Sequence, residues 1–443
     1  MNEKNEHRPV ASAPPDRRGA GRLAMLKRSF HHRNYRLFFS GQLVSLIGTW
    51  MQMVAQSWLV YRLTGSAALL GLVGFAGQIP IMLFSPIGGA VADRYYRRHV
   101  LLITQGASML LAALLAILTL TDHIQIWEIF VLASLLGVVN AFDVPARQAF
   151  VVEMVGRADL PNAIALNSSM FNGARIIGPA LAGFTVAAVG EGWCFLLNAA
   201  SFLAVLIALL AMRLPPHKLV PTEGKMLRHA IEGLSYVAHT RSFRSILLLL
   251  GLSSLTGMSY VVLMPVFAHR ILNGGPTTLG ALMGAAGFGA LLAALTLAMR
   301  PSLKGIVAWI ANGALGFGVS LMLFAWSANV WLSALLLVVV GYAMMLQMAA
   351  SNTLIQSMVP DAFRGRAMAA HAMVFMGMAP VGSLLSGLMA DRFGAPAAVA
   401  LGGATCILGA LLFRRGLPAL KNEVRELLHT QKALHAAEDA LRD

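Results

Sequence analysis

The feature that most constrains this chain is a succession of twelve apolar runs, each about 20 residues long. A hydrocarbon core roughly 30 Å thick needs about that length to be crossed by a helix. Strands of a membrane barrel alternate and would give weaker apolar segments. We therefore predict an all-α polytopic membrane protein whose spans cover 37–63, 67–92, 100–120, 126–146, 162–189, 193–212, 245–272, 278–299, 306–326, 330–351, 368–390 and 397–413.

Composition and charge agree with this interpretation. Hydrophobic residues make up 57% of the chain and charged residues 12%, about half the charged share of a soluble protein. If the N-terminus is cytoplasmic, 30 of the 34 Lys and Arg fall in the inward segments 1–36, 93–99, 147–161, 213–244, 300–305, 359–367 and 414–443. Because cytoplasmic loops concentrate Lys and Arg, we expect both termini to be cytoplasmic, in the inner (plasma) membrane. Topology and an anionic lipid leaflet then explain the net charge of +15 without nucleic acid.

A long polar segment divides the spans into six and six. We expect an amphipathic helix in this linker, where Met226, Leu227, Ala230, Leu234 and Val237 recur at helical spacing. Similar strings recur in the two halves: GGAVADRYY ends span 2 and SGLMADRFG ends span 11, which favours internal duplication. The expected units are a basic N-terminal segment, a six-helix bundle, the linker, a second six-helix bundle and a cytoplasmic tail, at 1–36, 37–212, 213–244, 245–413 and 414–443.

Polar side chains form a stripe along the first span. Gln42, Ser45, Thr49, Gln52 and Gln56 fall within an arc of about 80° and extend over about 21 Å of helix axis. Lipid cannot satisfy amide groups, so the stripe must face water or protein. We predict that it lines a substrate cavity, and hydrogen bonding between helices is the alternative.

The fifth span carries an arginine deep in the membrane. Arg175 lies about 20 Å from the expected start of its helix, and it shares an arc of about 60° with Ser168, Asn172 and Pro179. A charge at that depth normally faces a cavity or a partner. We predict that Asn172 and Arg175 belong to the substrate cavity, with bonding to carbonyls of neighbouring helices as the alternative.

The fourth span has polar residues near its inner end. Asp143 and Arg147 are four residues apart and can pair on one helix face, with Asn140 one turn earlier. An internal salt bridge and a gate or proton-linked switch both fit this spacing. No Asp or Glu lies centrally in any predicted span. If transport is coupled to protons, Asp143 is therefore the first candidate for the coupling carboxylate.

Enzyme chemistry has no support in the sequence. The chain has no Gly-x4-Gly-Lys-Ser/Thr phosphate loop, no His/Cys cluster with metal-ligand spacing and no convincing nucleophile constellation. Cys194 and Cys406 both lie in apolar runs, where free cysteine is usually a small buried residue. We expect no metal and no cofactor, and a gradient rather than ATP as the direct energy source.

The stretch GAVADRYYRR resembles the signature between spans 2 and 3 of the major facilitator superfamily. The matching residues are Gly89, Asp93, Arg94, Arg97 and Arg98, while Tyr96 replaces the usual glycine and predicts a differently shaped turn. The longer strings NAFDVPARQAFVVEMV and LPNAIALNSSMFNGARIIGPALAG resemble the branch of enterobactin-type exporters and related secretion carriers. Within GARIIGPALAG the small-residue face of that branch keeps Gly178, Pro179 and Gly183 but has Ala174 and Ala182 at positions often occupied by glycine.

The resemblance implies a secondary active transporter with two six-helix bundles. It would export a small organic molecule, siderophore-like or amphiphilic, by alternating access, as an antiporter driven by the proton gradient. In the loop signature, ion pairs that form in one state and break in the other would act as a conformational switch, and a positive-inside anchor is the alternative. A multidrug efflux pump, a lipid or lysolipid translocase and a non-transporting membrane scaffold stay open, as does the oligomeric state.

Overall fold

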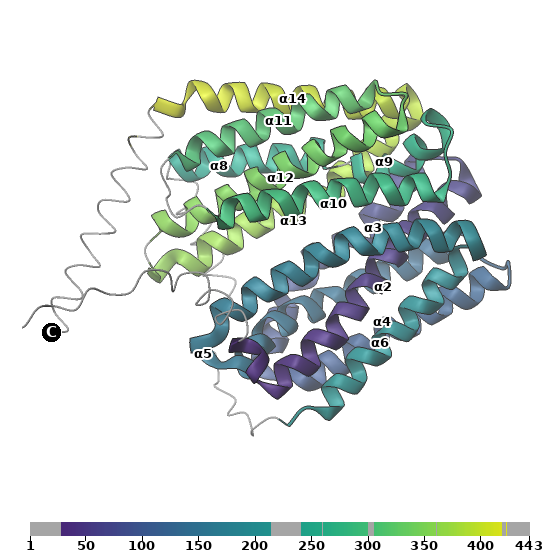
Figure 1. Cartoon of the computed structure of the whole chain (residues 1–443), viewed down its shortest axis with the longest axis vertical. Coiled ribbons are helices and arrows are strands. Elements are labelled where there is room, and N and C mark those ends of the chain that lie inside the picture. The colour runs from purple at the N-terminus through teal and green to yellow at the C-terminus, as the bar shows by residue number, and fades with distance from the viewer. Residues whose placement is uncertain are drawn as a thin grey trace, which may run out of the picture.

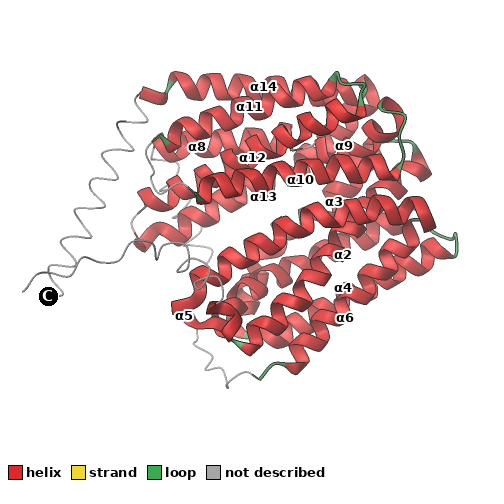
Figure 2. Ribbon diagram, in the orientation of Figure 1, coloured by secondary structure: helices red, strands yellow, loops and turns green. Residues whose placement is uncertain are grey.

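The structure of the protein is a computed structural model that describes residues 28–213, 241–258, 260–299, 305–359, 361–418 and 422. Within these ranges it consists of helices joined by short connections (Figure 2). The expected amphipathic helix at 226–237 lies outside the described residues, as do residues 1–27 and 423–443 of the two terminal segments.

Two bundles of helices lie side by side (Figure 1). The first half comprises η1 (Ser29–His31), α2 (Arg33–Thr64), α3 (Ala67–Arg94), α4 (Arg97–Leu120), α5 (Ile126–Val189) and α6 (Glu191–Ala211). The second half comprises α8 (Arg241–Leu252), η2 (Ser253–Gly257), α9 (Tyr260–Val266), η3 (Phe267–Ile271), α10 (Pro276–Ala298), α11 (Ile306–Ala325), α12 (Val330–Met358), α13 (Asp361–Phe393) and α14 (Ala395–Arg415). This arrangement confirms the predicted pair of bundles.

Helix α5 contains two membrane spans. Its 64 residues would extend about 96 Å if straight, three times the hydrocarbon core. Gly156 interrupts it with φ 70° and ψ 176°, in a region that glycine adopts without steric cost. The segment 147–161, expected as a polar loop, is therefore helical on both sides of Gly156. Eleven helices within the described residues are long and apolar enough to cross a membrane, and counting α5 twice confirms the predicted twelve.

The span predicted at 245–272 is divided into four segments. Two π-helical turns interrupt it: η2 lies between α8 and α9, and η3 follows α9. At η2 the backbone of Gly257 lies against a ring, since a Cβ atom there would approach Phe317 Cε1 to 2.2 Å. The Ser254 hydroxyl donates a 2.5 Å hydrogen bond to the carbonyl of Phe375 on α13. Such turns arise where local packing displaces the regular hydrogen-bond ladder.

The two ends of the bundle differ in charge. We name the end that carries η1, the Tyr95–Tyr96 turn and Gly156 the basic face, because arginines cluster there. The opposite end, at which α3 and α10 begin, is named the far face. It carries three of the four arginines that lie outside the predicted inward segments, namely Arg62, Arg270 and Arg392.

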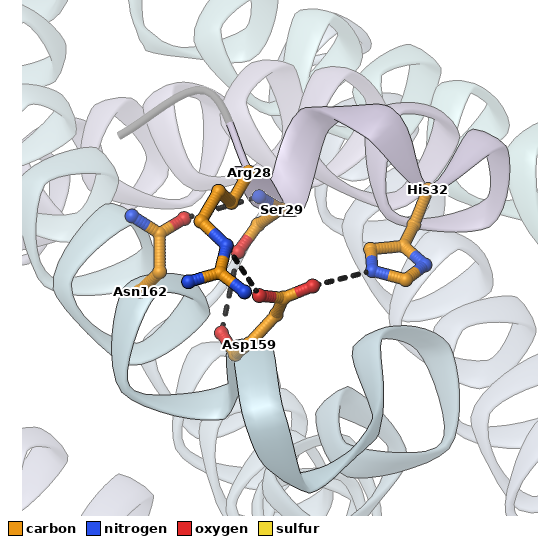
Figure 3. A network of polar contacts seen from close by, with 5 residues as sticks. All are labelled: Arg28, Ser29, His32, Asp159 and Asn162. Carbon is orange, nitrogen blue, oxygen red and sulfur yellow. Dashed lines mark hydrogen bonds and ion pairs between the residues drawn. The ribbon is translucent and has the colours of Figure 1, made fainter. Parts of the chain in front are cut away.

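The start of the described chain is anchored on α5 at the basic face (Figure 3). Asp159 accepts a 2.9 Å contact from His32 and pairs with Arg28 Nε at 3.2 Å. The Ser29 amide donates to Asn162 Oδ1 at 3.2 Å. The hydrogen bond from His32 and the charge of Arg28 hold the pKa of Asp159 below its usual value. These contacts connect η1 to the turn after Gly156 within the first half.

Candidate functional site

The two halves meet along two antiparallel helix pairs, α3 with α13 and α5 with α10. Toward the far face these contacts are close. A Cβ atom at Gly71 would lie 2.5 Å from the Ser383 carbonyl oxygen, and one at Gly280 would lie 2.4 Å from the Pro179 carbonyl oxygen. Backbones can approach so closely only where glycine removes the side chain. The halves are therefore tightly closed at the far face.

Toward the basic face, side chains at the same two interfaces become exposed. On α3 the Met82 side chain is 39% exposed, and on α13 Met376 is 51% exposed. On α5, Phe171 is 47% exposed. Met82 and Met376 continue the stripes of α3 and α13 that are buried at Gly71 and Ser383. The Met82 side chain still reaches α13, since a Cβ atom at Gly377 would lie 2.9 Å from its sulfur. We infer from these exposures that a space between the halves, named here the central cleft, opens toward the basic face. Figure 1 shows the two bundles converging at the other end.

The polar stripe of α2 is divided between two environments. Gln42, Ser45 and Gln52 are buried, whereas Thr49 is exposed and Gln56 is half-buried. The Gln52 carbonyl accepts a 2.6 Å hydrogen bond from the side-chain amide of Asn198 on α6. Part of the stripe therefore contacts a neighbouring helix of the same half.

Glycines beside the stripe explain this division. A Cβ atom at Gly48 would lie 2.6 Å from Asn198 Oδ1, and one at Gly41 would lie 2.8 Å from the carbonyl oxygen of Ala204. The two glycines are seven residues apart and bring α2 against α6. Sequence reasoning missed Asn198 as a partner, and the Gly41–Gly48 spacing was the signal that could have located the packed face.

Arg175 is half-buried on α5 beside aromatic rings. Its guanidinium carbon lies 5.9 Å from the centroid of Trp50, and Trp50 contacts Phe171 edge to face at 5.7 Å. Within the described ranges no carboxylate pairs with Arg175. A cation positioned in this way can bind an anion that enters from the cleft.

Asn172 lies one turn before Arg175 but is buried. Its side-chain amide donates a 2.9 Å hydrogen bond to the carbonyl of Ser168 on the same helix. The structure thus places the two predicted cavity residues of α5 in different surroundings.

The small-residue face of α5 packs against both halves. A Cβ atom at Gly178 would lie 2.4 Å from Trp50 Cβ on α2, and one at Gly183 would lie 2.7 Å from the carbonyl oxygen of Pro276 on α10. The Pro179 carbonyl approaches Gly280, as described above. This face therefore joins α2 on one side and forms part of the far-face closure on the other.

Asp143 lies in a buried polar cluster between α4 and α5. Its side chain is 3% exposed and pairs with Arg147 at 3.1 Å. Arg147 contacts Oδ2 of this carboxylate, whereas Thr104 and Gln105 donate hydrogen bonds of 2.9 and 2.7 Å to Oδ1. Asn140 is half-buried one turn away. The two donors from α4 connect that helix to α5 through the carboxylate.

The loop signature is held together by Arg97. Its guanidinium binds Glu153 of α5 at 2.5 Å and reaches Asp93 at 3.7 Å. Arg98 donates a 3.0 Å hydrogen bond to the carbonyl of Leu210 on α6, whereas Arg94 is exposed. Glu153 was not predicted as a partner of Arg97, although it lies in the string NAFDVPARQAFVVEMV. Gly89, the first residue of the signature, is half-buried on α3.

Comparison with known proteins identifies relatives along almost the whole chain. The family model described as transmembrane secretion effector matches residues 27–439. The staphyloferrin A transporter of Staphylococcus aureus is 27% identical over 395 residues, which cover 89% of this chain and 99% of the relative. The multidrug efflux pump Tap of Mycolicibacterium fortuitum is 28% identical, with 78% and 87% covered. Macrolide efflux protein A of Streptococcus pyogenes is 23% identical, with 89% and 98% covered.

Solved structures share the fold. A bacterial homologue of the lysosomal transporter Spinster, inward-facing and unoccupied, aligns with a TM-score of 0.67 and 16% identity, covering 90% of this chain and 98% of that chain. A POT family transporter in complex with 5-aminolevulinic acid aligns with a TM-score of 0.71 and 13% identity, with 88% and 96% covered. At these identities the likeness concerns the arrangement of the helices.

Proposed function

Because this chain belongs to the transmembrane secretion effector family of the major facilitator superfamily, it is a membrane transporter, and we propose that it exports an anionic amphiphilic molecule. The basic face is cytoplasmic in this proposal and the far face is external, in the inner membrane. Substrate enters the central cleft from the cytoplasm and leaves after the halves close at the basic face and open at the far face. The similarity to a staphyloferrin A transporter, a multidrug efflux pump and a macrolide efflux protein supports a small organic substrate.

The observation that carries this proposal is the environment of Arg175. Its guanidinium contacts Trp50 at cation–π distance and has no carboxylate partner within the described ranges. An unpaired cation within a membrane span costs several kcal/mol unless water or an anion compensates it. A substrate carboxylate, or another planar anion, would bind the guanidinium fork in two places while its apolar part stacks against Trp50 and Phe171.

The remaining wall of the cleft favours a second candidate, multidrug efflux. Met53, Met82 and Met376 are exposed along α2, α3 and α13, and methionine adapts to ligands of different shape. Thr49 and Gln56 would add hydrogen-bonding groups to this wall. An exporter of anionic molecules requires the charge of Arg175 for every substrate, whereas a multidrug efflux pump does not.

Energy coupling would use the carboxylate of Asp143. The carboxylate contacts Arg147 on its own helix and Thr104 and Gln105 on α4. Protonation would remove the charge that attracts Arg147, and it would weaken the hydrogen bonds from Thr104 and Gln105 that connect α4 with α5. We assign to this cluster the proton step of an antiporter, in which an inward proton exchanges for outward substrate.

The test is transport into inverted membrane vesicles with an imposed pH gradient. Matched anionic, neutral and cationic amphiphiles serve as substrates for wild type, Arg175→Lys and Arg175→Gln. Loss of a charged hydrogen bond costs about 1.5–3 kcal/mol, so apparent affinity for the anion should fall about 10- to 150-fold in Arg175→Gln. The lysine variant should lose less, because it keeps charge but not the planar fork.

Arg414→Gln is the matched control, since Arg414 is an exposed cation on α14, outside the cleft. Folded protein is quantified in the same membranes. Export of neutral or cationic compounds that persists in Arg175→Gln would favour the multidrug candidate. Movement of labelled lipid without export would indicate a lipid or lysolipid translocase, and no gradient-dependent movement of any compound would leave a membrane scaffold.

A further inference from the structure

Helices α3 and α13 run antiparallel across the boundary between the halves, and each ends in the same sequence pattern. The pattern Gly-x-x-Ala-Asp-Arg-aromatic places Asp93 at the basic-face end of α3 and Asp391 at the far-face end of α13. The carboxyl end of each helix therefore lies beside the amino end of the other. The two aspartates occupy mirrored positions on opposite sides of the membrane.

At the far face the aspartate bridges the halves. Asp391 Oδ1 accepts a 3.0 Å hydrogen bond from the backbone amide of Ala67 and a 3.3 Å hydrogen bond from the hydroxyl of Ser66. The Ser66 oxygen in turn accepts a hydrogen bond from the amide of Leu69 and is the N-cap of α3. A carboxylate from the second half thus caps a helix of the first half, where the helix dipole favours negative charge.

We propose that Asp391 is a positioning residue of the transport cycle that holds the far gate closed while the cleft is open at the basic face. The contact named here the far latch consists of Asp391, Ser66 and Ala67. It breaks when the halves separate at the far face. Asp93 is its mirror on the basic face and stabilises the opposite state. In the present state Asp93 lies 3.7 Å from the guanidinium of Arg97, the first residue of α4. Within the described residues Asp93 makes no bond to the second half.

The surroundings of the far latch support a contact that must open. A cavity of about 340 Å³ adjoins it, lined by Tyr61 and Ala67 from the first half and by Arg270 and Asp391 from the second. One turn further in, a Cβ atom at Gly387 would lie 2.7 Å from the carbonyl oxygen of Ala67. The capping contact and the glycine contact must therefore separate together.

A pair of spin labels measures the gate without any substrate, so its result is independent of the proposed cargo. Labels at His123 and Asn273, which are exposed in far-face loops of the two halves, report the separation of the halves in lipid nanodiscs. A carboxylate at a helix N-terminus has a modest effect at exposed sites, so Asp391→Asn should raise the ratio of far-open to far-closed molecules about 2- to 5-fold. Ser66→Ala should give a smaller shift, because the Ala67 amide remains.

Asp93→Asn is the opposing variant and should lower the same ratio. Asp122→Asn is the matched control, because it removes one negative charge from a far-face loop of the first half. An unchanged distance distribution in Asp391→Asn, or a shift of equal size in Asp122→Asn, overturns the far latch. A shift of Asp93→Asn toward the far-open state refutes the mirrored roles. Each variant is compared at equal recovery of monodisperse protein. If Asp391→Asn misfolds, Asp391→Glu replaces it. The glutamate variant should keep the ratio of far-open to far-closed molecules nearer to the wild-type value than Ser66→Ala does.

Discussion

Replacing Gln52 with Leu distinguishes the two possible roles of the polar stripe on α2. The Gln52 side chain is 6% exposed, and its carbonyl accepts a 2.6 Å hydrogen bond from Asn198. The substitution preserves the apolar environment of the helix and removes this acceptor. The donor amide of Asn198, which is 2% exposed, is then left without its partner. We therefore expect Gln52→Leu to act mainly on stability.

The expected magnitude follows from these contacts. Leaving a buried donor unsatisfied costs about 1–3 kcal/mol. Side-chain hydrogen bonds between membrane helices average about 0.6 kcal/mol and reach about 1.7 kcal/mol, because the unfolded chain also finds partners in the membrane. The short distance and deep burial place this bond in the upper part of that range. We expect the free energy of unfolding to fall by about 1–2 kcal/mol.

A double-mutant cycle with Asn198→Leu measures the pair itself. Unfolding of the four proteins in the same detergent gives the coupling free energy, which should be about 1 kcal/mol. Transport per folded molecule should remain near wild type in Gln52→Leu. In Thr49→Val, the matched change at an exposed stripe residue, transport should fall with little effect on stability. A normal unfolding free energy together with impaired transport in Gln52→Leu would refute the packing argument.

Two further predictions concern coupling and topology. Asp143→Asn should lower the free energy of unfolding by about 2 kcal/mol, because the largely buried Arg147 keeps its charge without a counter-ion. The purified variant should also release fewer protons than wild type when substrate binds. Proton release equal to that of wild type would exclude Asp143 as the coupling group. A cysteine at Asn273 should react with an impermeant thiol reagent from outside the cell and one at Tyr95 should not, and the reverse labelling pattern would invert the proposed orientation.

Local sequence was sufficient to predict the spans and the family. Apolar length predicted each membrane crossing because a helix must match the hydrocarbon thickness whatever its neighbours are. The same reasoning placed a loop at 147–161, where the structure has helix on both sides of Gly156. Helices can continue into the interfacial region after the apolar run ends, so hydropathy locates the membrane better than it locates the ends of a helix.

The site was less predictable because its contacts join residues far apart in the chain. A helical arc correctly groups Gln42, Ser45, Thr49, Gln52 and Gln56, but it does not say which part of that arc meets α6. Similarly, the spacing of Asp143 and Arg147 predicted a pair that the structure contains at 3.1 Å. The two donors from α4 that complete this cluster have no local signal, since any polar residue on a neighbouring helix could have supplied them.

The sequence by itself determined that this protein crosses the membrane twelve times, carries its positive charge at one face and belongs to a transporter family. These properties depend on matching each segment to lipid or water, which is decided residue by residue along the chain. Only the tertiary structure decided that Gln52 faces Asn198, that Arg97 binds Glu153 and that Asp391 caps α3. Each of these contacts requires two separate helices at a particular rotation and depth, and that geometry is set by close packing of glycine-lined surfaces throughout the bundle.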